Sequence, residues 1–289
     1  MNLAHIVVAT DESDAGRQAV RTGVDIATRA SAKVTVMRAV PIPAVPVFVG
    51  VRGAADHFGA PTDAVETDRL RRWLEADVLP PDDRHGVETA VTFGVPGVEI
   101  CRFGESHAAD LMVLGRKPRS QMARLLLGDT ADAVARRSRL PCLFVPPGSG
   151  PIRRLLVALD GTDRGLAVLQ AACGFARAVK ASVAVVTVED EPAGEPAHLA
   201  SALPVERSAR LQSQVRMVLS RECVDGAKPL VDVRRGPIVE QVLAALEGSA
   251  ADALVVGYHR GGPPGVIEIG STARHLAHLA PCTVLTVPL

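Results

Sequence analysis

Residues 108–115 read AADLMVLG, and residues 250–257 read AADALVVG. Each octet opens on Ala-Ala-Asp, continues as an apolar run typical of a buried β-strand, and ends in glycine. The identical ends and the matching apolar centres indicate that one sequence unit occurs twice in the chain.

The likeness extends to both sides of these octets. HIVVATDES (5–13) matches RLLVALDGT (154–162), and each is an apolar run that ends in aspartate just before a helix start. Downstream of the octets the two halves align without a gap, so that Gly128 corresponds to Gly270. We therefore interpret the chain as an internal duplication.

Each repeat alternates short runs of Val, Ile and Leu with helical stretches, which predicts a parallel sheet with helices on both faces. In the first repeat we expect strands near 5–10, 33–38, 88–93, 110–114 and 142–145, and helices near 14–30, 64–78, 96–108 and 128–139. In the second repeat we expect strands near 154–159, 182–188, 229–233, 252–256 and 283–287, and helices near 163–179, 204–222, 236–249 and 271–280. The predicted domains are 1–147 and 148–289, with PPGSGP (146–151) as their linker.

The composition limits the kinds of partner that the protein binds. Among 289 residues, 47% are hydrophobic and only 3% are aromatic, so we expect an aliphatic core and no stacking platform for single-stranded nucleic acid. The formal net charge is zero, which provides no overall attraction to nucleic acid or to an anionic membrane. The basic pairs Arg116-Lys117 and Arg136-Arg137 are predicted to lie on solvated faces.

The cysteines and the N-terminus point to a cytoplasmic protein. The five cysteines contain no CxxC pair, which argues against a zinc or redox motif and favours buried thiols in a reducing compartment. The opening MNLAHIVVATDES lacks the pattern of a signal peptide, and no apolar window approaches the roughly 18 residues of a membrane span. We expect a soluble, cytoplasmic protein with no metal site.

Three features of each repeat are predicted to meet at the carboxyl ends of the strands, where open parallel sheets bind ligands. They are the aspartate after the first strand, the end of the second strand, and the loop from the octet's glycine to the fourth helix. Each feature has a structural alternative, since aspartate before Ser or Thr caps a helix and glycine permits a tight turn. Their joint occurrence in both repeats favours a ligand, and a Gly-rich loop before a helix start suits phosphate.

Each repeat resembles a universal stress protein domain, and the whole chain resembles a tandem member of that family. The resemblance rests on VVATDES and LLVALDGT, on the two octets, on GDTADAV and GSTARHL, and on the closing strands LFVP and VLTVP. It implies an α/β fold of two tandem, doubly wound, Rossmann-like parallel five-stranded sheets, each with strand order 3-2-1-4-5. It also implies that CLFV and TVLTV pair to form an internal pseudo-dimer, and it leaves further association as a homodimer open.

ATP-binding members of that family carry G-x-x-G-x9-G-[S/T] between the fourth strand and the fourth helix, with an aspartate near the ribose and a second-strand backbone group near the adenine. The second repeat matches except at Arg260, which stands where the second glycine is expected and is followed by Gly261. The resemblance thus implies an adenine nucleotide here, ATP first, with Mg²⁺ held only through the nucleotide. The predicted binding residues are Asp160, Val188, Val256, Gly257, Arg260, Gly261, Gly270, Ser271 and Thr272.

The first repeat departs further from the motif. Pro118 replaces the second glycine and removes a backbone donor, and Asp129 stands where Ser or Thr is expected. A carboxylate there repels a triphosphate by about 1 kcal/mol per charge pair at 4 Å in water, and by about 4 kcal/mol at an intermediate dielectric. We predict a weak or vestigial site at Asp11, Ala39, Leu114, Gly115, Gly128 and Thr130.

Three classes of function follow from these motifs. The first is a nucleotide-responsive regulator of a stress response that acts on an unidentified protein partner. The second is an interaction module that has lost nucleotide binding, because both repeats lack the second glycine. The third, an enzyme, has little support: no Ser-His-Asp order, HExxH or P-loop lysine occurs, although His259 and His275 flank the second site, so slow ATP hydrolysis is the most we expect.

Overall fold

The computed structural model describes residues 1–42, 62–84, 86–116, 129–160, 162–189, 203–222, 231–258 and 271–289. Within these ranges, no helix combines the length and the apolar character needed to cross a membrane. The Pro- and Gly-rich segment 43–61 and both motif loops, 117–128 and 259–270, lie outside the described residues.

The order of strands and helices follows the expected βαβα pattern in both repeats. The first repeat contains β1 (His5–Ala9), α1 (Asp14–Ala30), β2 (Lys33–Val40), α2 (Asp63–Trp73), β3 (Val87–Phe93), α3 (Pro96–Ser106), β4 (Leu111–Gly115), α4 (Asp129–Arg137) and β5 (Cys142–Val145). The second contains β6 (Arg154–Leu159), α5 (Asp163–Ala178), β7 (Ser182–Glu189), α6 (Leu203–Glu222), β8 (Val231–Arg235), α7 (Ile238–Ser249), β9 (Ala253–Tyr258), α8 (Ser271–Leu279) and β10 (Thr283–Pro288).

The predicted bounds lie within two residues of the observed ones in every element but one. The helix expected at 64–78 changes at Leu74 from an α-helix to a π-helical turn that ends at Val78. The strand expected at 229–233 is β8, which runs two residues further, to Arg235. Arg234 donates to Asp232 of the same strand (2.7 Å) and Arg235 donates to Glu189 of neighbouring β7 (3.0 Å), so both arginines are ion-paired and the strand continues through them.

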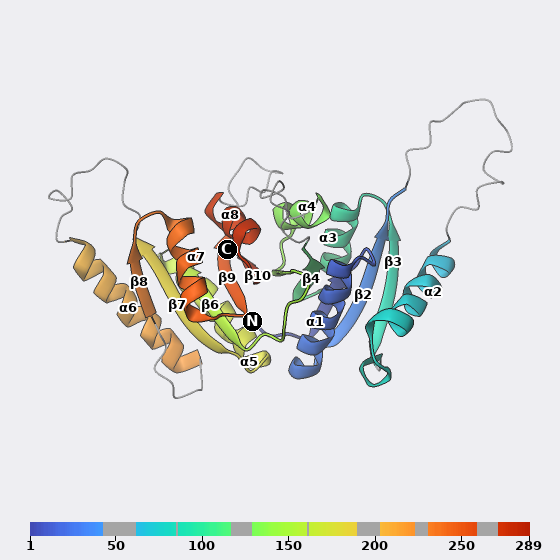
Figure 1. Ribbon diagram of the computed structural model, residues 1–289, viewed down its shortest axis with the longest axis horizontal. Coiled ribbons are helices and arrows are strands. Elements are labelled where there is room, and N and C mark those ends of the chain that lie inside the picture. Colours follow the sequence, from blue (N-terminus) through green and yellow to red (C-terminus); the bar gives the residue numbers. More distant parts are fainter. Residues whose placement is uncertain are drawn as a thin grey trace, which may run out of the picture.

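All ten strands form one sheet in the order β3-β2-β1-β4-β5-β10-β9-β6-β7-β8 (Figure 1). Each half has the expected order 3-2-1-4-5, read inward from its outer edge. The halves join where β5 and β10 pair antiparallel, with Leu143 opposite Leu285 and Phe144 opposite Val284. The pairing of the closing strands expected from the resemblance is therefore confirmed, and it merges the two five-stranded sheets into one.

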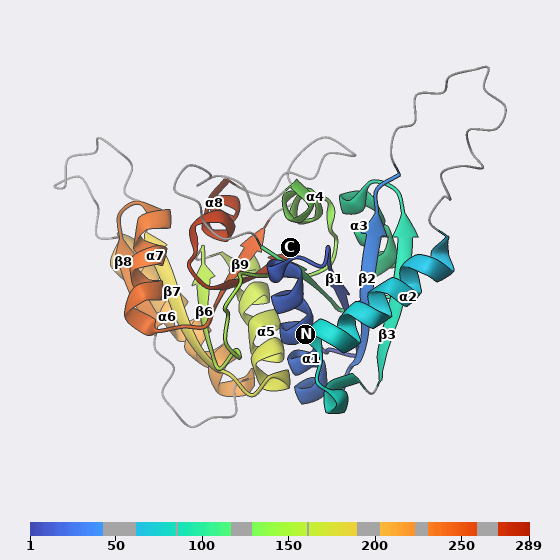
Figure 2. The ribbon, with the colours of Figure 1, turned by 45° about the vertical axis from the view of Figure 1, so that its right-hand side comes forward.

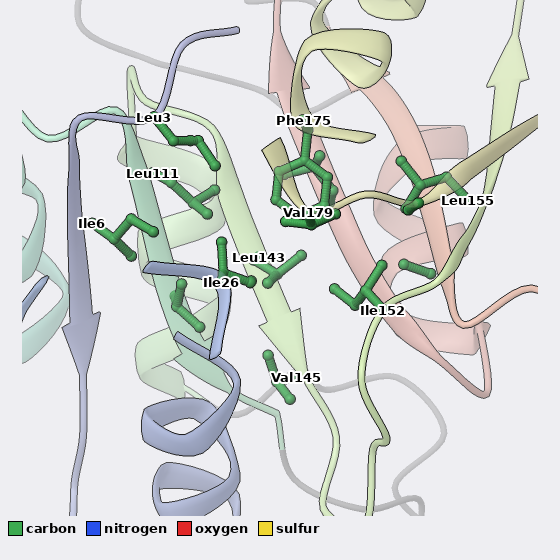
Figure 3. Close-up of a cluster of buried hydrophobic side chains, with 14 of the residues drawn as sticks. Leu3, Ile6, Ile26, Leu111, Leu143, Val145, Ile152, Leu155, Phe175 and Val179 are labelled. Atoms are coloured by element: carbon green, nitrogen blue, oxygen red, sulfur yellow. The ribbon is translucent and has the colours of Figure 1, made fainter. Parts of the chain in front are cut away.

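Helices cover both faces of this sheet, and each face has one core that crosses the junction between the repeats. One core contains side chains of α1, α2, α5 and α6, and α1 and α5 lie side by side over the centre of the sheet (Figure 2). In it, Ile26 and Leu143 of the first repeat lie near Ile152 and Phe175 of the second (Figure 3). The other core contains side chains of α3, α4, α7 and α8. Because both cores are shared, the repeats stabilise each other.

The cysteines are free thiols in the described part of the chain. Cys101, Cys142 and Cys173 are buried, as expected, but Cys282 is only partly buried. Burial is the main cause that raises the pKa of Cys101 and of Cys142 to about 12, so both are protonated and unreactive at neutral pH. Cys223 lies outside the described residues.

Candidate functional site

In the first repeat, residues near the carboxyl ends of three strands lie in one register row. Ala9 of β1 pairs with Met37 of β2 on one side and with Leu114 of β4 on the other. The predicted site residues Asp11 and Ala39 each lie two residues beyond this row, at the carboxyl edge of the sheet. Leu114, also predicted, is within the row and buried.

The second repeat has the same arrangement. Ala158 of β6 pairs with Val186 of β7 and with Val256 of β9, so Asp160 and Val188 again lie two residues beyond one row. Neighbouring strands are about 4.8 Å apart, which brings these predicted residues to one edge of the sheet. The structure thus brings the strand-end members of both predicted sites to one edge of the sheet.

The aspartates at both edges take part in helix capping. The Oδ1 atom of Asp160 accepts from the backbone N of Thr162 (3.0 Å) and from its hydroxyl (2.8 Å). That hydroxyl in turn accepts from the N of Gly165 (3.2 Å), which makes Thr162 the N-cap of α5. Asp11 binds the N of Ser13 (3.1 Å) and its hydroxyl in the same way, ahead of α1. The structural alternative, helix capping, therefore accounts for one carboxylate oxygen in each repeat.

The glycines that end β4 and precede Tyr258 are required by packing. A Cβ atom on Gly115 would lie 2.4 Å from the carbonyl carbon of Ala15, in the backbone of α1. A Cβ atom on Gly257 would lie 2.5 Å from Cγ2 of Val168, in a side chain of α5. These two glycines permit the close approach of a helix, whether or not a ligand binds nearby.

Arg116 is not solvated, contrary to the prediction. It is only 5% exposed, and its guanidinium crosses to the second repeat. There it donates to the carbonyl oxygens of Ala277 (2.7 Å), Ala280 (2.8 Å) and Cys282 (2.8 Å), at and just beyond the C-terminal end of α8. The carbonyls at a helix end lack intrahelical donors and carry partial negative charge, which a buried cation satisfies.

Tyr258 holds the equivalent position in the second repeat and makes the reciprocal contact. The tyrosine is 1% exposed, and its hydroxyl donates to the carbonyl oxygen of Ser138 (2.9 Å), one residue beyond the end of α4. Arg116 and Tyr258 therefore each cap the fourth helix of the other repeat. We call these two contacts the cross-caps.

A buried polar cluster joins α4 to α8 next to the cross-caps. The Oδ1 atom of Asp132 lies 3.7 Å from Nε of Arg274 and 3.6 Å from Nε2 of His278, and Asp132 also pairs with Arg136 along α4. The side chains of Asp132 and His278 are 5% and 3% exposed. Burial, and then the positive charges of Arg274 and Arg116, lower the pKa of His278 to about 4, so it is neutral at pH 7.

The remaining predicted residues surround the motif loops. Thr130 and Thr272 lie at the starts of α4 and α8, and both are partly buried. Ser271 begins α8. Gly128, Arg260, Gly261 and Gly270 lie outside the described residues.

Sequence reasoning did not identify the cross-caps, although the sequence carries a signal for them. Aligning Gly115 with Gly257 places Arg116 and Tyr258 at equivalent positions, each after an apolar strand. An arginine and the chain's single tyrosine at one repeated position indicate a shared role for two long side chains with polar ends. The prediction that Arg116-Lys117 is a solvated pair considered charge alone.

The fold and the carboxyl edge of the sheet in each repeat define the class of protein. It is a tandem of doubly wound α/β repeats that share one sheet, and the strands end in the same arrangement in both repeats. The chain belongs to the Universal stress protein family, whose family model matches residues 2–146 and again residues 151–288.

Individual proteins are similar to this chain in sequence or in fold. The chain is 28% identical over 140 residues to "Universal stress protein MJ0531" of Methanocaldococcus jannaschii, a match that covers 48% of this chain and 80% of that protein. A universal stress protein from Archaeoglobus fulgidus has the same fold over 98% of both chains, with a TM-score of 0.68 and 18% identity. A universal stress protein solved in complex with cAMP is 25% identical, with a TM-score of 0.35, and covers 51% of this chain and all of its own.

Proposed function

We propose that this protein is a stress-response regulator that binds an adenine nucleotide, ATP foremost, at the second repeat. The observation that supports it is the partial phosphate motif from Gly257 to Thr272, which begins near the end of β9, where Ala158 of β6 is in register with Val186 of β7 and Val256 of β9. A helix start at such an edge offers backbone N–H donors and a positive dipole end to phosphate. Free, buried thiols fit our proposal that the protein acts in the reducing cytoplasm.

The contacts of Arg116 favour the second repeat over the first. In the first repeat α4 begins at Asp129, whose carboxylate would repel phosphate unless a neighbouring cation such as Arg116 offset that charge. Its guanidinium instead donates to carbonyls at the end of α8. In the second repeat α8 begins with Ser271 and Thr272, which bring hydroxyl groups and no charge to the same position.

A matched pair of variants tests the proposal. ATP would be titrated into the full-length protein by calorimetry, with Thr272→Val and Thr130→Val as equivalent changes in the two repeats. We expect one site per chain, and about a 3- to 10-fold weaker affinity for Thr272→Val only, the loss of one hydrogen bond. Absence of ATP binding at millimolar concentration would refute the proposal, and an effect confined to Thr130→Val would move the site to the first repeat.

A second candidate, an interaction module without a nucleotide, is favoured by the broken motif in both repeats. Pro118 and Arg260 replace the second glycine, and the residues that follow Gly115 and Gly257 serve as internal cross-caps. Under this hypothesis Ser271→Ala leaves the stress phenotype of a deletion strain fully complemented. Loss of complementation with normal protein levels would count against it.

A further inference from the structure

We propose that Arg116 of the first repeat is a positioning residue for the nucleotide site of the second repeat. It holds α8 at its C-terminal end, and the N-terminal end of the same helix forms part of the proposed site. The nucleotide half of this inference rests on the proposed function, while the effect on α8 does not.

The geometry gives Arg116 control over the end of α8. Three carbonyl oxygens, on Ala277, Ala280 and Cys282, each lie within 2.8 Å of a guanidinium nitrogen. These acceptors span the last turn of α8 and the chain that leads into β10, so a single planar group fixes where the helix stops. The side chain is buried, so bulk water cannot readily replace it.

α8 is short enough for this restraint to matter. It has nine residues, and isolated helices shorter than about 12 residues are marginal in water. Its order therefore depends on packing and on groups that satisfy its ends. A cation at the C-terminal end and an anion at the N-terminal end both stabilise the same helix dipole. Binding at one end is consequently linked to order at the other, because a ligand binds more weakly when its competent state is less populated.

The first repeat holds α8 at a second point. Asp132 of α4 approaches both Arg274 (3.7 Å) and His278 (3.6 Å), one turn apart on α8. Two residues of the first repeat, Arg116 after β4 and Asp132 on α4, thus contact α8, the helix that begins with Ser271 and Thr272. In this arrangement the first repeat positions α8, and the second repeat binds the nucleotide.

The test uses the full-length protein with Arg116→Met and Arg116→Lys. Arg102→Met is the control, since Arg102 lies on the exposed surface of α3. One measurement is hydrogen exchange of residues 271–279 without nucleotide, and the other is ATP affinity by calorimetry. We expect Arg116→Met to speed exchange in 271–279 at least 10-fold, to leave 14–30 unchanged, and to weaken ATP binding at least 10-fold. Arg116→Lys should recover part of both effects, because an ammonium cannot reach all three carbonyls in the geometry of a guanidinium.

Tyr258→Phe provides the reciprocal comparison, because it should speed exchange in 129–137 and not in 271–279. If Arg116→Met leaves exchange in 271–279 unchanged, the inference is wrong. It is also wrong if exchange rises while ATP affinity stays the same. If the wild-type protein binds no ATP, the proposed function fails and the nucleotide half of the inference fails with it, whereas the exchange data still decide whether Arg116 holds α8. Should Arg116→Met not fold, Arg116→Lys carries both measurements.

Discussion

In the first repeat the residue after the octet's glycine is an arginine, and in the second repeat it is a tyrosine. Both side chains cross to the other repeat and both cap a helix, yet Arg116 satisfies three carbonyls with a charge while Tyr258 satisfies one with a hydroxyl. The two repeats therefore share one backbone arrangement and differ in the side chains through which they contact each other. Because Arg116 makes more contacts than Tyr258, α8 is held more strongly than α4. The helix α8 belongs to the repeat in which the phosphate motif is better preserved.

The polar cluster between α4 and α8 is a second place where the two repeats differ at their contact. Asp132 and Arg274 occupy equivalent positions in the two repeats and face each other with opposite charge. Two copies of the same repeat would bring two aspartates or two arginines together at this position. Complementary charge therefore favours the pairing of unlike repeats, as repulsion between like charges does in other specific interfaces.

Among the predicted effects on stability, we expect the largest from a charge reversal in this cluster. We expect Asp132→Arg to lower the free energy of unfolding by about 3–5 kcal/mol, because it places a cation at a position that is 5% exposed, next to Arg136 and Arg274 and without the carboxylate that pairs with them. The double variant Asp132→Arg/Arg274→Asp should regain a substantial part of that loss. Urea unfolding of the single and double variants measures both.

The exposed pair on α2 supplies the control for this reversal. Asp68→Arg, next to Arg72 on the surface, should change stability by less than about 1 kcal/mol. A double variant no more stable than Asp132→Arg alone would contradict the role of charge complementarity.

Gly115 and Gly257, at equivalent positions in the two repeats, permit a second comparison. We expect Gly115→Ala to cost about 1–3 kcal/mol, because the new Cβ would meet backbone atoms of α1. Gly257→Ala should cost less, because its new Cβ would meet side-chain atoms, Cγ2 of Val168 (2.5 Å) and Cδ1 of Leu289 (3.1 Å), and side chains shift more easily than a helix backbone. Thermal unfolding of the matched pair tests this order, and equal destabilisation would show that the helices approach β4 and β9 with the same tolerance.

Removal of the tyrosine hydroxyl should have a smaller effect. Tyr258→Phe leaves the ring packed but removes the hydroxyl that donates to the carbonyl of Ser138, at an expected cost of about 1 kcal/mol. The midpoint of urea unfolding measures this change. A cost as large as that of Arg116→Met would mean that the two cross-caps are energetically alike, despite the difference in charge.

The last predicted effect is a pH dependence from His278. Its pKa is lowered from 6.5 to about 4 in the folded protein, so the unfolded chain binds more protons between these values. Stability should therefore fall as the pH drops from 6.5 to about 4. Above pH 6.5 His278 is neutral in both the folded and the unfolded protein, so it adds no pH dependence there. The charged and titratable groups around it are Asp132 and Arg136 of α4, Arg274 and His275 of α8, and Arg116.

We expect wild-type protein to lose more stability than His278→Gln between about pH 7.5 and about pH 5. Unfolding in urea at the two pH values measures the difference. Equal losses in the two proteins would mean that other groups carry the acid sensitivity.

The candidate site could be predicted from the sequence only in part. The register rows at Ala9 and Ala158 follow from strands whose ends are readable as apolar runs, so the meeting of Asp11 with Ala39, and of Asp160 with Val188, was predictable. Helix capping by Ser13 and Thr162 was equally readable, as the structural alternative. The destination of Arg116 was not, because its acceptors lie more than 160 positions away in the chain.

By itself, the sequence determined the duplication, the alternation of strands and helices, and the edge at which the strand ends gather. These depend on local periodicity and on chain direction, which neighbouring residues encode. Only the tertiary structure decided which polar side chains are buried and what they bind. The antiparallel pairing of β5 with β10 brings α4 and α8 together, and that contact turns Arg116, expected in solvent, into a helix cap for the other repeat. Whether a charge is solvated depends on surfaces from distant parts of the chain, and no local pattern specifies those.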